Sequence, residues 1–316
     1  SFALLVYASS WLKCHYPDVF CAALLNAQPM GFYAPAQIVR DAEDHGVTVA
    51  PVDINHSHWD CTLQGPRDAP VIRLGMCLVR SLREAEARRI VDARLHAGPF
   101  TSIDTLLRRT GARIASLRAL ARADAFTSLD IDRQHALWRL QSLRDEHLPL
   151  FDTPDPDDDH AEPDLDADVH LPPFTAPAQV RDDYHAVGLS LRDHPIHFIR
   201  PHLEAQGVTP NRELADQRTW TPGRFIRVAG LVLVRQRPST ASGVLFITLE
   251  DETGIANLII HPKFYERFRT TIRASTALMV RGRVERNGIV VHVVAHGIES
   301  LDPHLGELTS RSRDFH

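Results

Sequence analysis

The sequence predicts a multidomain protein of the α + β class, with a helical N-terminal half, an acidic linker and a C-terminal β-barrel. Apolar residues recur at helical spacing in residues 2–45 and 75–143. They alternate with polar residues along five runs between 223 and 300, and a Pro-rich acidic stretch separates the two patterns. A length of 316 residues is enough for two or three domains.

The formal net charge of −5 hides an uneven distribution. Residues 67–150 carry fifteen Arg against ten acidic residues, and residues 223–316 carry thirteen basic against nine acidic residues. Residues 151–170 carry nine acidic residues and no Lys or Arg. Because the 149–177 segment also holds seven Pro, it cannot bury enough apolar surface to fold, and we expect a linker. The two flanking modules are basic, as a partner with a phosphate backbone requires.

Several classes of protein are excluded at this stage. No run approaches the roughly 18 apolar residues of a membrane span, and the apolar opening lacks the flanks of a signal peptide. We therefore expect a cytoplasmic protein without membrane contact. The chain begins at Ser1, without Met, inside a predicted helix, so we expect part of a longer protein. The four Cys have no zinc-ligand spacing, and Cys14 and Cys21 are predicted to be buried.

The helical half is divided by Pro and Gly. Pro17 begins a second helix after the one at the N-terminus, and Gly46 ends a third, which is followed by an extended segment over 48–55. Further on, Ser102 or Thr101 caps the middle one of three helical runs. These runs, joined by short turns into paired hairpins, cover 75–95, 102–111 and 114–126.

The C-terminal pattern has period two and predicts five strands, with one helix between the third and the fourth. This order is that of the OB-fold, a small five-stranded barrel that binds oligonucleotides, oligosaccharides or proteins. The strands cover 224–236, 243–251, 254–260, 277–286 and 289–298, and the helix covers 262–272.

Four Arg surround the predicted turn over residues 79–84, just before a helix: Arg80, Arg83, Arg88 and Arg89. A helix N-terminus offers backbone N–H groups to a phosphate, so this turn, with Ser81 at its centre, is a candidate DNA-binding hairpin. A solvated Arg face on a helical bundle is an equally good interpretation.

In the barrel, the alternation places Leu245, Ile247 and Leu249 inside and Phe246 outside, where its ring is a candidate platform for a base. The alternative is a surface Phe covered by a neighbouring domain. Four Arg on the first and fourth strands are candidates to follow a single-stranded backbone: Arg235, Arg237, Arg281 and Arg283.

No catalytic motif is present, and we predict neither a catalytic residue nor a metal site in this chain. Carboxylates spaced by two residues fall in the linker, where nothing fixes their geometry, and His56 and His58 lack a third ligand. At the edge of the linker, His147, Leu148, Leu150 and Phe151 form a short motif that fits an apolar pocket of a partner or else closes the helical module.

Four segments resemble the bacterial C-family DNA polymerases, above all the error-prone branch related to the polymerase III alpha subunit. They are SFALLVYASSWLKCHYPDVFCAALLNAQPMGFY, VAPVDIN, RLGMCLVRSLREAEARRIVDAR and GLSLRDHPIHFIR. The resemblance implies the end of a fingers region over 1–66 and a tandem helix-hairpin-helix module over 67–148. A connecting segment over 178–222, an OB-fold barrel over 223–302 and a tail over 303–316 follow the linker.

The resemblance also implies a DNA polymerase that acts in translesion synthesis and damage-induced mutagenesis. Its partners are primer-template duplex and single-stranded template, and its two Mg²⁺ ions lie in a palm domain upstream of this chain. The 147–151 motif is similar to a sliding-clamp peptide, with His147 in place of the usual Gln, and implies a clamp and accessory mutagenesis proteins as partners. Ser81 also departs from the family, in which this turn usually has Gly. The alternative function is a stand-alone DNA-binding or protein-interaction scaffold in DNA repair.

Overall fold

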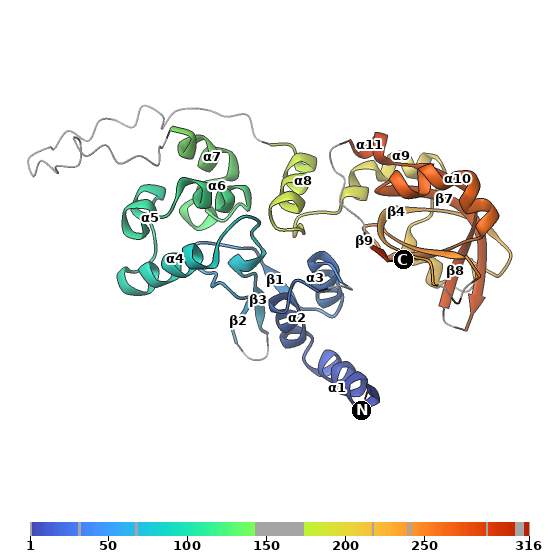
Figure 1. Cartoon of the computed structure of the whole chain (residues 1–316), viewed down its shortest axis with the longest axis horizontal. Coiled ribbons are helices and arrows are strands. Elements are labelled where there is room, and N and C mark those ends of the chain that lie inside the picture. The colour runs from blue at the N-terminus through green and yellow to red at the C-terminus, as the bar shows by residue number, and fades with distance from the viewer. Residues whose placement is uncertain are drawn as a thin grey trace, which may run out of the picture. The chain divides into compact units, whose positions relative to one another are not determined.

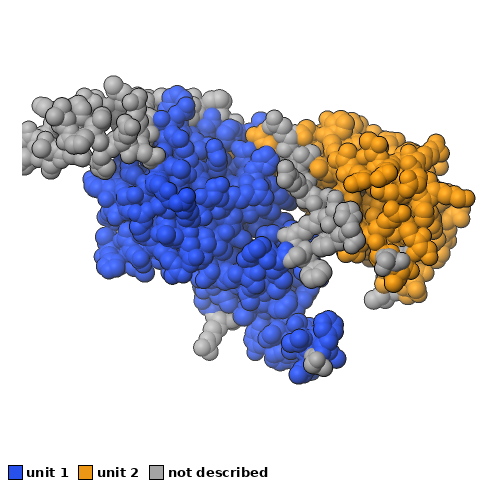
Figure 2. All heavy atoms as spheres, in the orientation of Figure 1, with its two compact units in different colours: residues 1–175, 182–191 blue, residues 176–181, 192–316 orange. Residues whose placement is uncertain are grey.

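The computed structural model describes residues 2–30, 33–66, 69–142, 174–216, 218–238, 240, 242–288, 290–306 and 313–315. The chain forms two compact units (Figure 1 and Figure 2). The first contains residues 1–175 and 182–191, and the second contains residues 176–181 and 192–316. The finer domain borders stay predictions.

The first unit begins with α1 (Phe2–His15), α2 (Pro17–Asn26) and α3 (Pro35–Asp44). The predicted role of Pro17 is confirmed, and Gly46 follows α3 with a φ of +80°. Helix α1 has no buried residue among those described, and it exposes many apolar side chains. The prediction that Cys14 is buried is wrong because Cys14 lies on this exposed helix, whereas Cys21 is in the core.

A small sheet follows, in the order β1-β3-β2, built from β1 (Thr48–Ala50), β2 (Thr62–Gln64) and β3 (Val71–Arg73). Strand β1 runs parallel to β3, and β2 runs antiparallel to it. Only β1 lies in a segment that the sequence predicts to be extended, because three-residue strands are too short to show alternation. Ile72 in the central strand is fully buried.

The rest of the first unit is helical and shares one hydrophobic core with the small sheet. The helix expected over 75–95 begins only at Glu84, after a 3₁₀ turn, so the prediction is wrong for its first residues. The Ser102 cap is confirmed, since the Ser102 hydroxyl accepts a hydrogen bond of 3.1 Å from the Thr105 N–H. The elements are η1 (Met76–Leu78), α4 (Glu84–Ala97), α5 (Ile103–Thr110), α6 (Ile114–Arg122), η2 (Thr127–Leu129) and α7 (Arg133–Ser142). Helix α8 (Ala176–Ala186) is divided between the two units, since its residues 176–181 belong to the second.

The second unit contains the predicted barrel, which is confirmed. Its strands follow the order β5-β6-β8-β7-β4, and β4 pairs back onto β5 to close the barrel. The last strand, β9, runs parallel to β4 and lies in the segment that was expected to be a tail. The elements are η4 (Pro195–Ile199), α9 (Arg200–Ala205), η5 (Asn211–Ala215), β4 (Phe225–Gln236), β5 (Leu245–Glu250), β6 (Ile255–Ile260), α10 (Pro262–Ala274), β7 (Ala277–Asn287), β8 (Val290–Ser300), α11 (Asp302–Leu305) and β9 (Arg313–Phe315).

Barrel closure depends on β4, whose first half pairs with β7 and whose second half pairs with β5. Gly230 sits where the two pairings meet. A Cβ at this position would lie 2.5 Å from the carbonyl oxygen of Glu250 on β5, so the two backbones approach more closely than a side chain allows. Within the described ranges, every helix falls short of the length and apolar character that a bilayer crossing requires.

We expect Gly230→Ala to lower the free energy of unfolding of the barrel by about 1–3 kcal/mol, because β4 and β5 must separate to admit the methyl group. Urea unfolding followed by circular dichroism measures the change. Gly254→Ala is the matched control, since its nearest neighbour would lie at an ordinary contact distance of 3.6 Å. Equal stability of both variants would contradict this account of closure.

Candidate nucleic-acid interface

The turn before α4 exposes three of the residues predicted to bind DNA: Arg80, Ser81 and Arg83. Ser81 has a φ of +67°, a left-handed conformation that favours Gly. The turn therefore has the backbone geometry of a Gly-containing hairpin although its sequence has Ser. The Arg80 N–H donates to the Ala186 carbonyl oxygen at 2.9 Å, which fixes one side of the turn.

Arg88 and Arg89 lie on α4 itself and are engaged by carboxylates of its first turn. Arg88 contacts Glu84 at 2.5 Å, and Arg89 pairs with Glu86. The two Glu occupy the positive end of the helix dipole, where the sequence analysis places a phosphate. The structure thus brings Arg80 and Arg83 together at the turn and directs Arg88 and Arg89 toward acidic neighbours.

A second hairpin, which the sequence analysis did not single out, joins α5 to α6 through Gly111 in the left-handed conformation. The first turn of α6 carries no acidic residue, and Arg113 stands at its N-cap. The buried Glu86 carboxylate accepts the Arg113 Nε–H at 3.3 Å and so ties this hairpin to α4. The sequence signal was Gly-Ala-Arg directly after a helix. Because the N–H groups of all three residues donate within the chain, we add only the exposed Arg113 side chain to the candidate phosphate contacts.

The outer face of β5 carries Phe246, as predicted. Leu245, Ile247 and Leu249 are buried inside the barrel, while the Phe246 ring is half-buried on the other face, beside Gln236 and Ile259 of the neighbouring strands. Its role as a stacking platform stays a prediction.

The two Arg at the end of β4 have different environments. Arg237 is exposed, with its guanidinium 5.2 Å from the centre of the Tyr265 ring. Arg235 is only 6% exposed, and its Nε–H donates to the Ile272 carbonyl oxygen at 2.8 Å while Nη2 donates to that of Ser275. The prediction that Arg235 follows a DNA backbone is therefore wrong, because its guanidinium caps the C-terminal end of α10.

Arg281 and Arg283 are exposed on the same face of β7, as predicted, and they flank an aromatic residue that the sequence analysis missed. The Phe225 ring is 47% exposed, and its centre lies 5.6 Å and 5.3 Å from the two guanidinium groups. The register of β4 and β7, which the sequence does not show, places Phe225 directly opposite Arg283.

The comparisons with known proteins agree with both modules. Residues 46–136 match the helix-hairpin-helix motif family, and residues 226–301 match the OB-fold nucleic acid binding domain family. Over its whole length the chain is 49% identical to error-prone DNA polymerase 2 of Rhizobium meliloti (strain 1021). It is 47% identical to the error-prone DNA polymerase of Allorhizobium ampelinum, again over the whole chain. The predicted resemblance to error-prone DNA polymerases is confirmed. The chain spans about 29% of the length of these two relatives.

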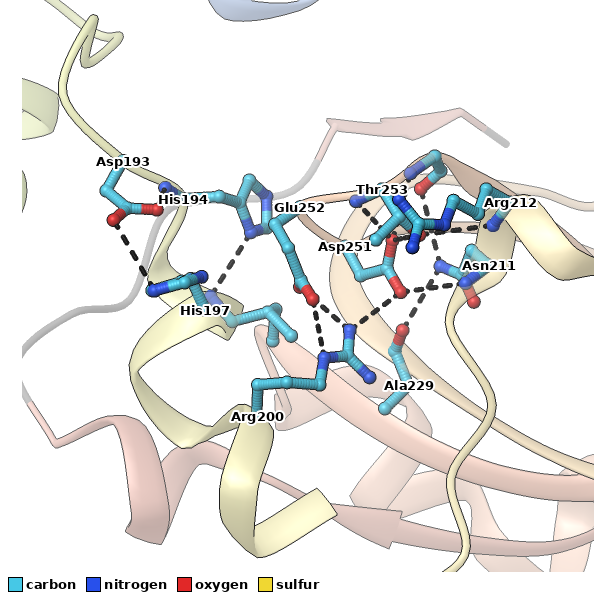
Figure 3. A network of polar contacts seen from close by, with 12 residues as sticks. Asp193, His194, His197, Arg200, Asn211, Arg212, Ala229, Asp251, Glu252 and Thr253 are labelled. Atoms are coloured by element: carbon cyan, nitrogen blue, oxygen red, sulfur yellow. Dashed lines mark hydrogen bonds and ion pairs between the residues drawn. The ribbon is translucent and has the colours of Figure 1, made fainter. Parts of the chain in front are cut away.

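Part of the resemblance to error-prone DNA polymerases lies in the segment before the barrel. A buried ionic network holds this segment to the turn between β5 and β6 (Figure 3). Nη2 of Arg200 donates to Asp251 at 2.8 Å and to Glu252 at 2.7 Å. Asp251 is fully buried and also accepts the Asn211 N–H at 2.9 Å. This network has a structural role, since it joins η4, α9 and η5 to the barrel.

Two groups of candidates lie outside the described residues: the clamp motif over 147–151 and the spaced carboxylates of the linker. His56 is described, and its Nδ1 lies 2.9 Å from a carboxylate oxygen of Asp53. Within the described ranges, no three His, Cys, Asp or Glu side chains gather as metal ligands would.

We expect Ser81→Gly to raise the free energy of unfolding of the first unit by about 1 kcal/mol, because it removes the cost of a left-handed non-Gly residue. Thermal unfolding measures the shift. Ser102→Gly is the control at a residue with a φ of −155°, where loss of the cap lowers stability by only a few tenths of a kcal/mol. A loss of stability in Ser81→Gly would contradict the assigned turn.

Proposed function

We propose that this chain is the DNA-binding C-terminal portion of an error-prone DNA polymerase that acts in translesion synthesis and damage-induced mutagenesis. The full protein would add dNTPs to a DNA 3′ end under the direction of a template. The observation that carries the proposal is similarity to error-prone DNA polymerases along the whole chain, together with two modules of nucleic-acid-binding families.

The catalytic step is assigned to a palm domain upstream of this chain, with its two Mg²⁺ ions. The residues described here do not fit such ions, because within these ranges no three potential ligands converge. Two-metal catalysis needs several carboxylates held on rigid elements. The contact between His56 and Asp53 offers only one carboxylate, at a turn. We therefore assign no step of the reaction to the described residues.

The two units supply different contacts to DNA in this proposal. The hairpin turns at Arg80 to Arg83 and at Gly111 to Arg113 carry exposed Arg side chains beside the N-termini of α4 and α6, which suit the phosphates of a duplex. The barrel presents exposed aromatic rings and Arg side chains, which suit unpaired bases and their backbone. A clamp and accessory mutagenesis proteins belong to the same proposal as further partners.

A protein-interaction scaffold is the second candidate function, and one observation favours it. Helix α1 exposes Phe2, Tyr7 and Trp11 by 77%, 68% and 44%, which is typical of a surface that contacts another protein segment. Negligible DNA binding at low salt would favour this function over the first.

We expect the 316-residue chain to bind a mixed-sequence duplex with an affinity that falls steeply with salt, because Arg–phosphate contacts release counterions. Replacing Arg80 and Arg83 together by Ala removes about two phosphate contacts and lowers the slope of log K against log salt by about 1.8. Fluorescence anisotropy at several salt concentrations measures both quantities.

The matched control is Arg88→Ala, which removes one Arg that Glu84 already engages. Its duplex affinity and salt slope should stay close to those of the parent chain. If Arg88→Ala weakened duplex binding as much as the double variant, the turn would not be the contact.

We also expect no nucleotide incorporation when the pure chain is mixed with primer-template, dNTPs and Mg²⁺, because the catalytic carboxylates are assigned to another part of the protein. A denaturing gel of labelled primer measures extension. Primer extension that survives further purification would sink this assignment.

A further inference from the structure

One side of the barrel carries a compact group of aromatic and basic side chains, which we name the Phe225 patch. Phe225 and Arg227 come from the start of β4, Arg281 and Arg283 from β7, and His296 from β8. The Phe225 ring meets the His296 ring edge-on at 5.3 Å, and both β7 guanidinium groups lie within 6 Å of its centre. The ring is thus held in place although almost half of its surface is exposed.

The patch ends sharply where the segment before the barrel covers the same strands. Ala229 and Leu231 of β4, with Met279 of β7, pack under η4 and α9 in a separate apolar core. Outside this core, the next residues on the same face are Arg. Arg227 lies two residues before Ala229 on β4, and Arg281 lies two residues after Met279 on β7. This face of the sheet is therefore divided into an apolar part that η4 and α9 cover and a basic part that is exposed.

Folding accounts for only part of this composition: Nη1 of Arg227 donates to the Gln206 carbonyl oxygen at the end of α9. Arg227 lies directly opposite Arg281 in the antiparallel ladder, and like charges in this position destabilise a sheet. Within the described ranges, no carboxylate lies within 4 Å of the guanidinium groups of Arg227, Arg281 or Arg283. Unneutralised like charges that surround an exposed ring are suited to an anionic ligand with an aromatic part.

We infer that the Phe225 patch binds single-stranded nucleic acid, with one base stacked on Phe225 and backbone phosphates bound by Arg281 and Arg283. The strand β7 places these two Arg about 7 Å apart at their Cα atoms, so they can contact neighbouring phosphates of an extended strand. A duplex keeps its bases paired and stacked, whereas a single strand presents the base face that the ring requires.

This site is separate from the face of Phe246. Phe246 lies opposite Gln236 near the end of β4, whereas Phe225 is the first residue of that strand. The inference extends the proposed function, because it gives the barrel a strand-binding surface on β4, β7 and β8. It does not depend on polymerase activity, and it stands whether or not the hairpin turns bind duplex.

The test uses the 316-residue chain and a fluorescent dT15 oligonucleotide. We expect Phe225→Leu, which keeps an apolar side chain without an aromatic face, to weaken dT15 binding by about 5- to 150-fold. Phe225→Tyr should restore binding close to that of the parent chain. Duplex affinity should change little in both variants, so failure of this site and failure of the proposed duplex contact are distinguishable.

The Arg contribution is tested by Arg281→Ala with Arg283→Ala, which should lower the salt slope for dT15 by about 1.4. The matched control removes two exposed Arg of α10 by Arg269→Ala with Arg273→Ala, and its slope for dT15 should stay near the parent value. Thermal unfolding of each variant confirms that the barrel is intact.

Three results would overturn the inference. They are unchanged dT15 affinity in Phe225→Leu, an equal loss of slope in the α10 control, and competition by a poly-Glu peptide as strong as that by unlabelled dT15. A photo-crosslink between a 5-iodouracil base and Phe225 would support it, while adducts confined to Phe246 would count against it.

Discussion

The buried carboxylate of Asp251 is the interaction on which the functional surface of the second unit depends. Its Oδ1 accepts hydrogen bonds from the N–H groups of Thr253 and Gly254 at 2.8 Å and 2.9 Å. Its Oδ2 accepts hydrogen bonds from Nη2 of Arg200 and from the Asn211 N–H. A fully buried charge is tolerated only when it is paired and hydrogen-bonded in this way. By holding Arg200 and Asn211, Asp251 fixes the segment that packs on Ala229 and Leu231, and it thereby sets the border of the Phe225 patch.

Arg residues serve two purposes in this protein, and the burial of each guanidinium separates them. Arg94 donates to the Ile54 carbonyl oxygen at 2.7 Å inside the first unit, and Arg235 caps α10 inside the second. Arg281 and Arg283 stand on an exposed sheet face beside Phe225. The basic composition of a module therefore indicates a phosphate partner only after its structural Arg residues are set aside.

The strand pattern was sufficient to predict the barrel because alternation is a local property. Leu245, Ile247 and Leu249 face the interior as expected, and the helix after Pro262 lies between the third and fourth strands. The environment of Arg235 was not predictable in this way, because its partners are more than 30 residues away in sequence. Phe225 was missed for a related reason: the pattern of β4 does not reveal which part of its outer face α9 covers.

The Phe225 patch is the surface of the barrel to which we assign single-stranded nucleic acid. Arginine footprinting with phenylglyoxal tests this assignment most directly, because one experiment measures the reactivity of every exposed guanidinium group. The modified residues are identified by mass spectrometry with and without saturating dT15. We expect protection of Arg281 and Arg283, constant reactivity of Arg269 and Arg273, and low reactivity of Arg235 in both states. Protection of Arg237 with full reactivity of Arg281 and Arg283 would contradict it.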